Sequence, residues 1–160
     1  MRERLLFKQR FFSWFDSYDI YHEDGSVAYT VKGKLSWGHK FVIFDPVGNE
    51  LGSVQQKVLS FLPRFDFYGP GERYLGSMKK RFCFLQPRYA LDFKGWQIKG
   101  TWTEWDYTIT DSEEKEVAVI SKELWHLTDT YVIDTYNHDD ALYVLMFVLS
   151  IDAEKCSRQS

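Results

Sequence analysis

The chain has 160 residues, and 23 acidic against 20 basic side chains give it a formal net charge of −3. This balance argues against generic binding of nucleic acid, which requires a strongly basic surface. The length suits one domain with a sizeable core. Aromatic side chains make up 18% of the sequence, and because they fit pleated, half-buried surfaces, the composition favours β structure.

Targeting signals and cysteine pairs are missing from the sequence. The N-terminal segment MRERLLFKQRFFSWF lacks both the continuous apolar stretch and the small-residue cleavage site of a signal peptide. Cys83 and Cys156 lie far apart in the sequence, without the spacing of a metal site, and predict reduced thiols. We therefore expect a cytoplasmic protein with no bound metal or cofactor.

Glycines occur along the chain at steps of 23, 23 and 24 residues, and each follows a short aromatic run and precedes an alternating run. These are Gly25, Gly48, Gly71 and Gly95. Two such runs joined by a glycine-bearing turn predict a β-hairpin, and a regular period predicts a repeated unit. A fifth copy, WDYTITDSEEKEVAVISKEL, has a charged turn in place of the glycine.

The alternating runs share an apolar residue that we expect to face the core. These residues are Phe7, Val31, Val54, Met78, Ile98 and Ile120. The segment TYVIDTY closes the series, so the pattern predicts six alternating and six aromatic strands, about twelve in all.

A run of nine uncharged, mostly large apolar residues extends from Ala141 to Leu149. It predicts a helix over about residues 139–155, with Asp139 or Asp140 as the N-cap. The run is far shorter than the roughly 20 residues that a membrane span needs. Apolar side chains point in every direction around such a helix, which must therefore be buried on all sides.

A twelve-stranded barrel is wide enough to hold this helix. Strands about 4.8 Å apart and tilted by about 40° give a radius near 12 Å, whereas eight strands give only about 8 Å. We expect a closed antiparallel barrel of repeated hairpins around the C-terminal helix, as one domain over residues 1–156 with a short tail at 157–160. The alternative is a β-sandwich with the helix packed on one face.

The sequence resembles the bacterial branch of the LURP-one-related family, in the tubby-like superfamily. The matching features are Ser13, Asp16, Tyr18, Ile20, Asp24-Gly25, Val31-Lys32-Gly33-Lys34, Ser36, Gly38, Asp45, Gly48, Lys57, Ser60, Pro63, ISKELW and the helix start DDAL. The resemblance implies a twelve-stranded barrel around a hydrophobic helix. Its relatives include tubby proteins, which bind phosphoinositides at membranes, and phospholipid scramblases. It implies no catalytic residues.

A series of basic residues follows the core-facing positions and is expected to point outward. It comprises Lys8, Arg10, Lys32, Lys34, Lys57, Lys79, Arg81 and Lys99. This series would form a partial collar for anionic lipid head groups or a phosphorylated partner. The alternative is a solvated outer face whose lysines prevent aggregation, and the net negative charge favours that interpretation.

Two further patterns have plainer explanations. The segment HLTDTYVIDTYNHDD offers imidazole and carboxylate groups but no zinc or EF-hand spacing, and we interpret it as a turn and helix cap. Trp14, Trp37 and Phe61 would form an aromatic rim at the strand ends, although packing beneath the end of the barrel is the favoured interpretation.

The sequence shows no convergent catalytic group and no GxSxG, P-loop or HExxH motif. We therefore expect a non-enzymatic monomer that acts through its outer surface, with an anionic membrane as its leading partner and a location at the membrane periphery as one option. The alternative is a protein-interaction or scaffold module in a stress or regulatory pathway, with no lipid role.

Overall fold

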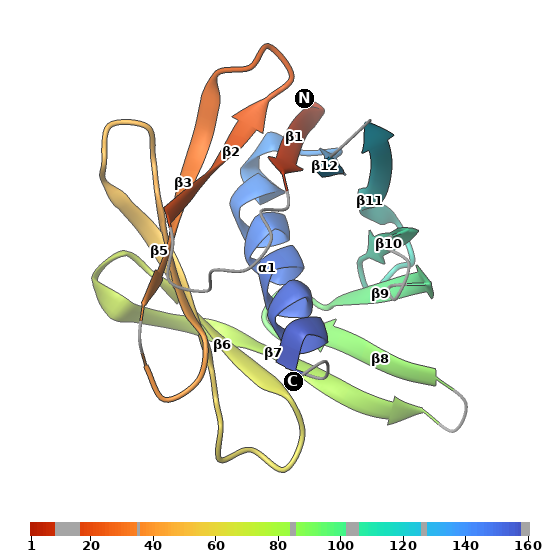
Figure 1. Cartoon of the computed structure of the whole chain (residues 1–160). Coiled ribbons are helices and arrows are strands. Elements are labelled where there is room, and N and C mark those ends of the chain that lie inside the picture. Colours follow the sequence, from red (N-terminus) through yellow and green to blue (C-terminus); the bar gives the residue numbers. More distant parts are fainter. Residues whose placement is uncertain (9–16, 35, 84–85, 102–105, 126–127, 158–160) are drawn as a thin grey trace.

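A computed structural model describes residues 1–8, 17–34, 36–83, 86–101, 106–125 and 128–157. The described residues form twelve antiparallel strands that close into one barrel around a single α-helix (Figure 1). Each strand pairs with its neighbours in sequence, and the first strand also pairs with the last, which closes the wall. The predicted barrel is confirmed, and the alternative sandwich is wrong.

The strands are short and follow one another in sequence order around the wall. They are β1 (Glu3–Lys8), β2 (Ser17–His22), β3 (Val27–Lys34), β4 (Lys40–Phe44), β5 (Glu50–Gln56), β6 (Arg64–Gly69), β7 (Arg73–Cys83), β8 (Gln86–Leu91), β9 (Trp96–Thr101), β10 (Asp106–Thr110), β11 (Glu116–Trp125) and β12 (Thr128–Thr135). Two 3₁₀ turns, η1 (Pro70–Glu72) and η3 (His138–Asp140), precede β7 and the helix α1 (Ala141–Ser157). Cys83 and Cys156 fall where side chains are not described.

The glycines that punctuate the sequence occupy the turns of four hairpins. Their φ angles lie between 65° and 94°, in the left-handed region that L-residues avoid, at Gly25, Gly48, Gly71 and Gly95. In the fifth hairpin Glu114 takes the same conformation, with φ 65°, and its turn is held by Asp111, whose carboxylate accepts from the backbone N–H groups of Glu113 and Lys115. The charged turn therefore reproduces the geometry that glycine provides elsewhere.

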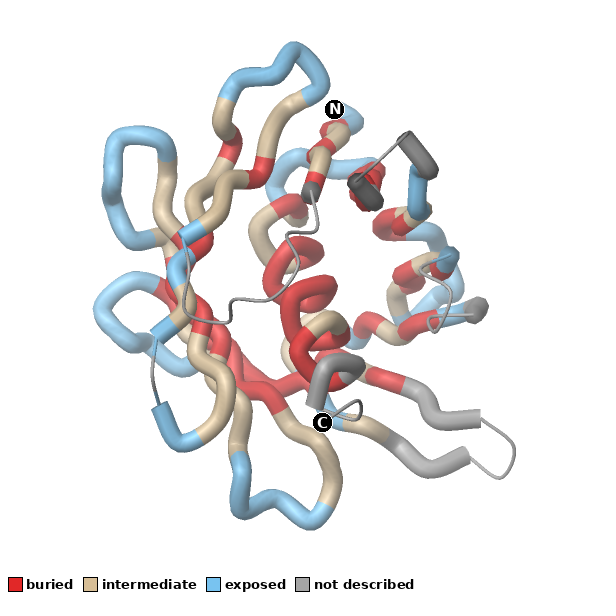
Figure 2. The backbone as a smooth tube through the Cα atoms, in the orientation of Figure 1, coloured by how far each residue is buried: buried red, intermediate tan, exposed pale blue. Residues whose placement is uncertain are grey.

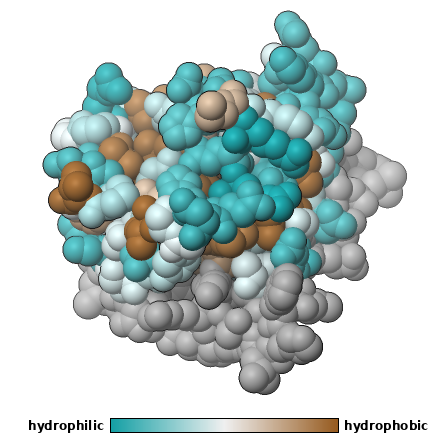
Figure 3. All heavy atoms as spheres, turned by 90° about the horizontal axis from the view of Figure 1, so that it is seen from above, coloured by the Kyte–Doolittle hydropathy of each residue, from teal (hydrophilic) through white to brown (hydrophobic). Residues whose placement is uncertain are grey.

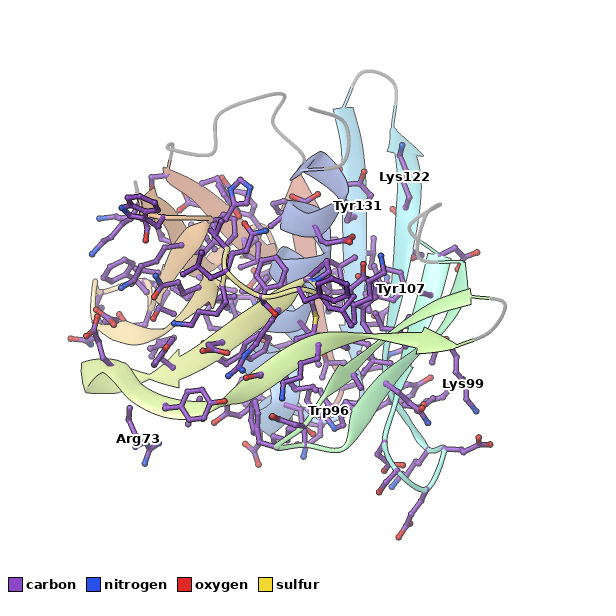
Figure 4. All side chains as sticks on the ribbon, turned by 90° about the horizontal axis from the view of Figure 1, so that it is seen from below. Arg73, Trp96, Lys99, Tyr107, Lys122 and Tyr131 are labelled. Carbon is purple, nitrogen blue, oxygen red and sulfur yellow. The ribbon has the colours of Figure 1, made fainter. Side chains whose placement is uncertain are left out.

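The expected core-facing residues all point into the barrel. None of the six is more than 6% exposed: Phe7, Val31, Val54, Met78, Ile98 and Ile120. From Val144 to Leu149 every residue of α1 is at most 1% exposed, and the helix runs through the middle of the barrel with buried residues on all sides (Figure 2). Seen from below, the buried rings of Tyr107 and Tyr131 lie beside this helix (Figure 4).

The helix begins two residues later and ends two residues later than the sequence predicted. Residues 138–140 form the turn η3, and its capping side chain is Asn137, whose Oδ1 accepts from the backbone N–H of Asp139. Asp140 instead accepts from Nζ of Lys94 at 2.9 Å. The assignment of Asp139 or Asp140 as N-cap is therefore wrong. No helix within the described ranges is long and apolar enough to cross a membrane.

The last turns of α1 carry polar groups into the barrel. Glu154 is 2% exposed, and its Oε1 lies 3.4 Å from Nζ of Lys80 on β7. Burial raises the pKa of Glu154, and a hydrogen bond with Tyr89 opposes part of this effect. Lys80 therefore connects the last turns of the helix to the barrel wall through Glu154. The carboxylate of Glu154 loses its hydration when the protein folds.

Truncation of the helix core should strongly destabilise the fold. Replacing the fully buried Phe147 by alanine removes packing atoms and leaves a cavity, which should lower the free energy of unfolding by about 3–5 kcal/mol. Val47→Ala, at a site that is 83% exposed, should change it by less than about 0.5 kcal/mol. Urea denaturation followed by circular dichroism measures both, and equal small losses would show that α1 is not the core.

Glu154→Gln should remove a pH dependence of stability. Because the folded-state pKa of Glu154 is raised above its ordinary value of 4.5, its contribution to stability is full below that pH and is lost as pH rises through the folded pKa. The unfolding free energy of the variant minus that of the wild type should therefore increase with pH across this window and then level off. Denaturation at a series of pH values tests this, and a difference that falls with pH would contradict it.

Candidate functional site

Two neighbouring loops at one end of the barrel are held against each other. The β3–β4 loop, of which residues 36–39 are described, and the β5–β6 loop, residues 57–63, both lie toward the end where α1 finishes (Figure 1). His39 O accepts from the backbone N–H of Gln56 at 2.8 Å, and Gln56 Oε1 accepts from the N–H of His39 at 3.2 Å. Gln55 Nε2 donates to Ser36 Oγ at 3.2 Å. Three bonds therefore fix the β3–β4 loop to the end of β5, where the β5–β6 loop begins.

Gly38 lies at a close approach between the β3–β4 loop and the residues around the end of β5. Its φ is +95°, and a Cβ at this position would lie 2.7 Å from Cγ2 of Val58 and 2.9 Å from the backbone oxygen of Gln56. Glycine here permits both the left-handed conformation and the close approach. The neighbouring residue, Trp37, is thereby placed beside the β5–β6 loop.

A pocket of about 540 Å³ lies between the loops and the outer face of the wall. It is lined by Trp37, Gln55, Gln56, Lys57, Val58, Leu59, Ser60, Arg64 and Asp66. Its size falls in the range of small-molecule sites. Amide and charged groups line it together with the apolar side chains of the two loops, so it can accept a group that is polar at one end and apolar at the other.

The charged groups of the pocket are organised around Asp66. Its carboxylate accepts from Arg64 Nε at 2.7 Å and from Ser77 Oγ at 2.7 Å, and lies 3.5 Å from Lys57 Nζ. Burial by itself would raise the pKa of Asp66, but the hydrogen bonds from Ser77 and Arg64 and the two nearby cations hold this pKa below its ordinary value. The Asp66 side chain is only 6% exposed, against 36% for Arg64 and 39% for Lys57. An approaching ligand therefore meets the cations before the carboxylate.

The tips of both loops carry apolar side chains that face water. Trp37 is 90% exposed, Leu59 99% and Phe61 100%, and the loops appear as exposed segments (Figure 2). Packing beneath the end of the barrel is therefore wrong for Trp37 and Phe61, while Trp14 lies outside the described residues. The reason is that β5 ends at Gln56 and β6 begins at Arg64, so the tip residues lie beyond the end of the strand pair.

The basic series does not behave as one continuous collar. Lys57 lines the pocket, and Lys79, which is exposed, lies opposite the pocket residue Arg64 in the β6–β7 register. Lys34, also exposed, lies opposite Lys40 at the start of the β3–β4 loop. These four cations, Lys34, Lys57, Arg64 and Lys79, together with the pocket and the exposed tips Trp37, Leu59 and Phe61, are called the loop-tip site below.

The other members of the series lie elsewhere or are not described. Lys32 is exposed on β3, with Nζ 4.9 Å from the centre of the Phe44 ring. Lys99 points away from the wall (Figure 4) and pairs with Glu114 at 2.9 Å, on the far side of the barrel from the loop-tip site. Arg10 lies outside the described residues, as do the side chains of Lys8 and Arg81.

The acidic and histidine-containing segment before α1 contacts charged side chains of β1. Asp134 accepts from Arg4 Nε at 2.8 Å, and His138 Nδ1 lies 2.6 Å from Oε2 of the buried Glu3. His22 Nδ1 lies 3.4 Å from the other oxygen of Glu3, so two histidines from distant turns meet at one carboxylate, which the sequence did not indicate. His126 lies outside the described residues, as does the side chain of Asp129. Among the described residues, no group of three potential ligands is placed to hold a metal ion.

Several residues of the loop-tip site were not predicted from the sequence. Gln55, Arg64 and Asp66 lie on outward positions of β5 and β6, and nothing in their spacing marks them. The segment KVLSFLPR could have given a signal, because it places Val58, Leu59, Phe61 and Leu62 between two strands without a glycine turn. A loop with this many apolar residues is a candidate contact surface.

Substitution at Gly38 should distinguish two costs to stability: the steric clash between the loops and the strain of a positive φ angle. Gly38→Ala and Gly48→Ala both place a side chain at nearly the same positive φ, but a Cβ at Gly48 would have no atom within 4 Å. Gly48→Ala should cost about 1–2 kcal/mol of stability, and Gly38→Ala about 1–3 kcal/mol more because it also forces the loops apart. Chemical denaturation measures both, and equal losses would show that the loops do not depend on this contact.

Comparison with known proteins places the chain in a family. The family model described as LURP-one-related matches residues 3–152. The uncharacterized protein YxjI of Bacillus subtilis is 28% identical over 149 residues, which cover 92% of this chain and 91% of that protein. An X-ray structure of a protein from Arabidopsis thaliana superimposes with a TM-score of 0.64 at 14% identity, covering 94% of this chain and 91% of that one, and shows the same fold. The resemblance seen in the sequence is therefore confirmed, and the chain belongs to the LURP-one-related family.

Proposed function

We propose that the protein is a non-enzymatic module that binds anionic phospholipid head groups at a membrane surface through its outer wall. The observation that carries this proposal is the joint presence of cations and exposed apolar side chains at the loop-tip site. Anionic bilayers present negative phosphates above an apolar layer, so both kinds of side chain find a partner there.

The charge distribution of the site supports this proposal although the whole chain is negative. A row of outward residues crosses five strands, from Lys34 and Lys40 through Gln55 to Asp66 and Ser77. Asp66 is buried beneath Lys57 and Arg64, and Lys40 pairs with the exposed Glu72 at 3.2 Å. The local surface is therefore positive, and the negative charge elsewhere would orient this end toward an anionic membrane.

The filled interior also favours action from outside the barrel. Helix α1 occupies the centre of the barrel, and the loop-tip pocket lies on the outer wall. The residues that line this pocket include no histidine and no cysteine, so they do not supply the usual nucleophile–base pair. Lysine and arginine beside amides and exposed apolar groups fit binding better than catalysis.

The strength of the charge interaction can be bounded. Each basic side chain near an anionic membrane contributes about 1 kcal/mol. Because the carboxylate of Asp66 offsets one of the four cations, the loop-tip site supplies about 3 kcal/mol. This corresponds to a dissociation constant of roughly 5 mM. Charge alone therefore gives weak binding that salt readily reverses.

Charge reversal should abolish binding to anionic vesicles when it is made near the loop-tip site. We expect the wild-type protein to co-sediment at low salt with phosphatidylcholine vesicles that contain phosphatidylserine, and not with phosphatidylcholine alone. The triple variant Lys32→Glu, Lys34→Glu and Lys79→Glu reverses two exposed cations of the loop-tip site and the exposed Lys32, two residues before Lys34 on the same face of β3. It should lose this binding because repulsion replaces attraction.

The matched control is the triple variant Lys99→Glu, Lys115→Glu and Lys122→Glu, which changes the net charge equally on exposed sites of β9, β11 and the turn between β10 and β11. It should keep most of the binding. Failure of the wild type to bind anionic vesicles even at low salt would overturn the lipid proposal and leave the protein-interaction module as the better account. Equal losses in both triple variants would instead show that net charge, not this site, controls binding.

A further inference from the structure

We infer that the loop-tip site inserts into the bilayer, with Trp37, Leu59 and Phe61 entering the region between head groups and acyl chains. This inference rests on the proposed function and specifies how the protein contacts the membrane. It assigns one end of the barrel as the membrane-facing end and makes apolar contact, in addition to charge, a determinant of affinity.

The first support is the unusual exposure of the tips. Scattered exposed apolar residues are common on protein surfaces, but a group of large ones at one point marks a contact surface. Trp37 and Leu59 line the same pocket, although they belong to different loops, and Phe61 lies two residues beyond Leu59. All three are at least 90% exposed. A tryptophan and a phenylalanine are side chains that favour membrane interfaces.

The second support is that the β5–β6 loop, which carries two of the tips, is held at both of its ends. The backbone N–H of Lys57 donates to the oxygen of Arg64 at 2.9 Å, and the N–H of Lys80 donates to the oxygen of Pro63 at 3.2 Å. Together with the bonds between His39 and Gln56 and the close contact at Gly38, these bonds fix both ends of the β5–β6 loop. A surface that is already ordered loses little conformational entropy when it binds.

The third support is the position of the cations directly behind the tips. Lys57 and Arg64 line the pocket beneath Trp37 and Leu59, and Lys79 lies next to Arg64 across the β6–β7 pair. If the tips enter the interface, these cations lie at the level of the lipid phosphates. Charge complementarity therefore identifies an anionic bilayer, and not an apolar protein surface, as the occupant.

The opposite end of the barrel provides a contrast. Its surface is mostly hydrophilic where it is coloured, with hydrophobic atoms in small separate groups (Figure 3). Val47 lies there in the β4–β5 turn and is 83% exposed. Val47 therefore serves as a control: it is an exposed apolar residue that lies outside the loop-tip site.

Environment-sensitive labels at the two ends test the inference directly. Cys83 and Cys156 are replaced by serine, and a single cysteine at Phe61→Cys or Val47→Cys carries the fluorophore NBD. With phosphatidylcholine and phosphatidylserine vesicles, the label at position 61 should shift to shorter wavelength and become protected from iodide, whereas the label at position 47 should change in neither respect.

A second variant gives a readout without labels. Leu59→Ser with Phe61→Ser changes only exposed loop residues, so the fold should persist by circular dichroism. Because two apolar side chains no longer enter the bilayer, the vesicle partition coefficient should fall by about 100-fold, and the residual binding should be more sensitive to salt. Val47→Ser should leave the partition coefficient unchanged.

The outcomes separate this inference from the proposed function. If the wild type co-sediments with anionic vesicles while the label at position 61 remains in water and the double serine variant binds normally, then insertion is wrong and surface binding stands. If the wild type ignores anionic vesicles at every salt concentration, both ideas fail.

Discussion

Burial of α1 inside the closed wall is the interaction on which the rest of the structure depends. Residues from Val144 to Leu149 present apolar side chains in every direction, so no single sheet face could cover them. Buried residues of the strands form one core cluster with those of the helix, and pairing of β1 with β12 closes the wall, so that it has no open edge. Helix and barrel therefore stabilise each other, because the helix fills a space that would otherwise be empty.

Because the helix fills the interior, the groups that could bind a partner lie on the outer wall and at the strand ends. There Asp66 organises Lys57 and Arg64 from the floor of the pocket, while Gly38 allows the two loops to meet. The exposed tips and the cations near them belong to one end of the molecule. Through this arrangement a chain with a net negative charge presents cations and apolar side chains together at this end.

The fold could be predicted from the sequence because turn glycines such as Gly48 and apolar residues such as Val54 recur at nearly regular steps along the chain, and these residues mark the turns and the inward positions of consecutive hairpins. The helix was evident from its unbroken apolar run. Its start was not evident, because the side chain that caps the turn before it is Asn137 and not Asp139 or Asp140. The site was harder to foresee. The alternation of residues along a strand predicts that Asp66 points outward, but not that its side chain is buried there. The packing of two loops against each other follows no sequence period, so it could not be predicted. The exposure of Phe61 depends on where β5 ends, which a pattern leaves uncertain by several residues.

The central claim is that α1 remains the core of the barrel when the protein acts, while one end of the wall makes contact. Hydrogen–deuterium exchange of the protein bound to anionic vesicles tests this most directly. The account predicts that amides of α1 exchange as slowly as in the free protein and that segments 36–39 and 57–63 gain protection. Faster exchange along α1 in the bound state would mean that the helix leaves the barrel, and it would contradict the account.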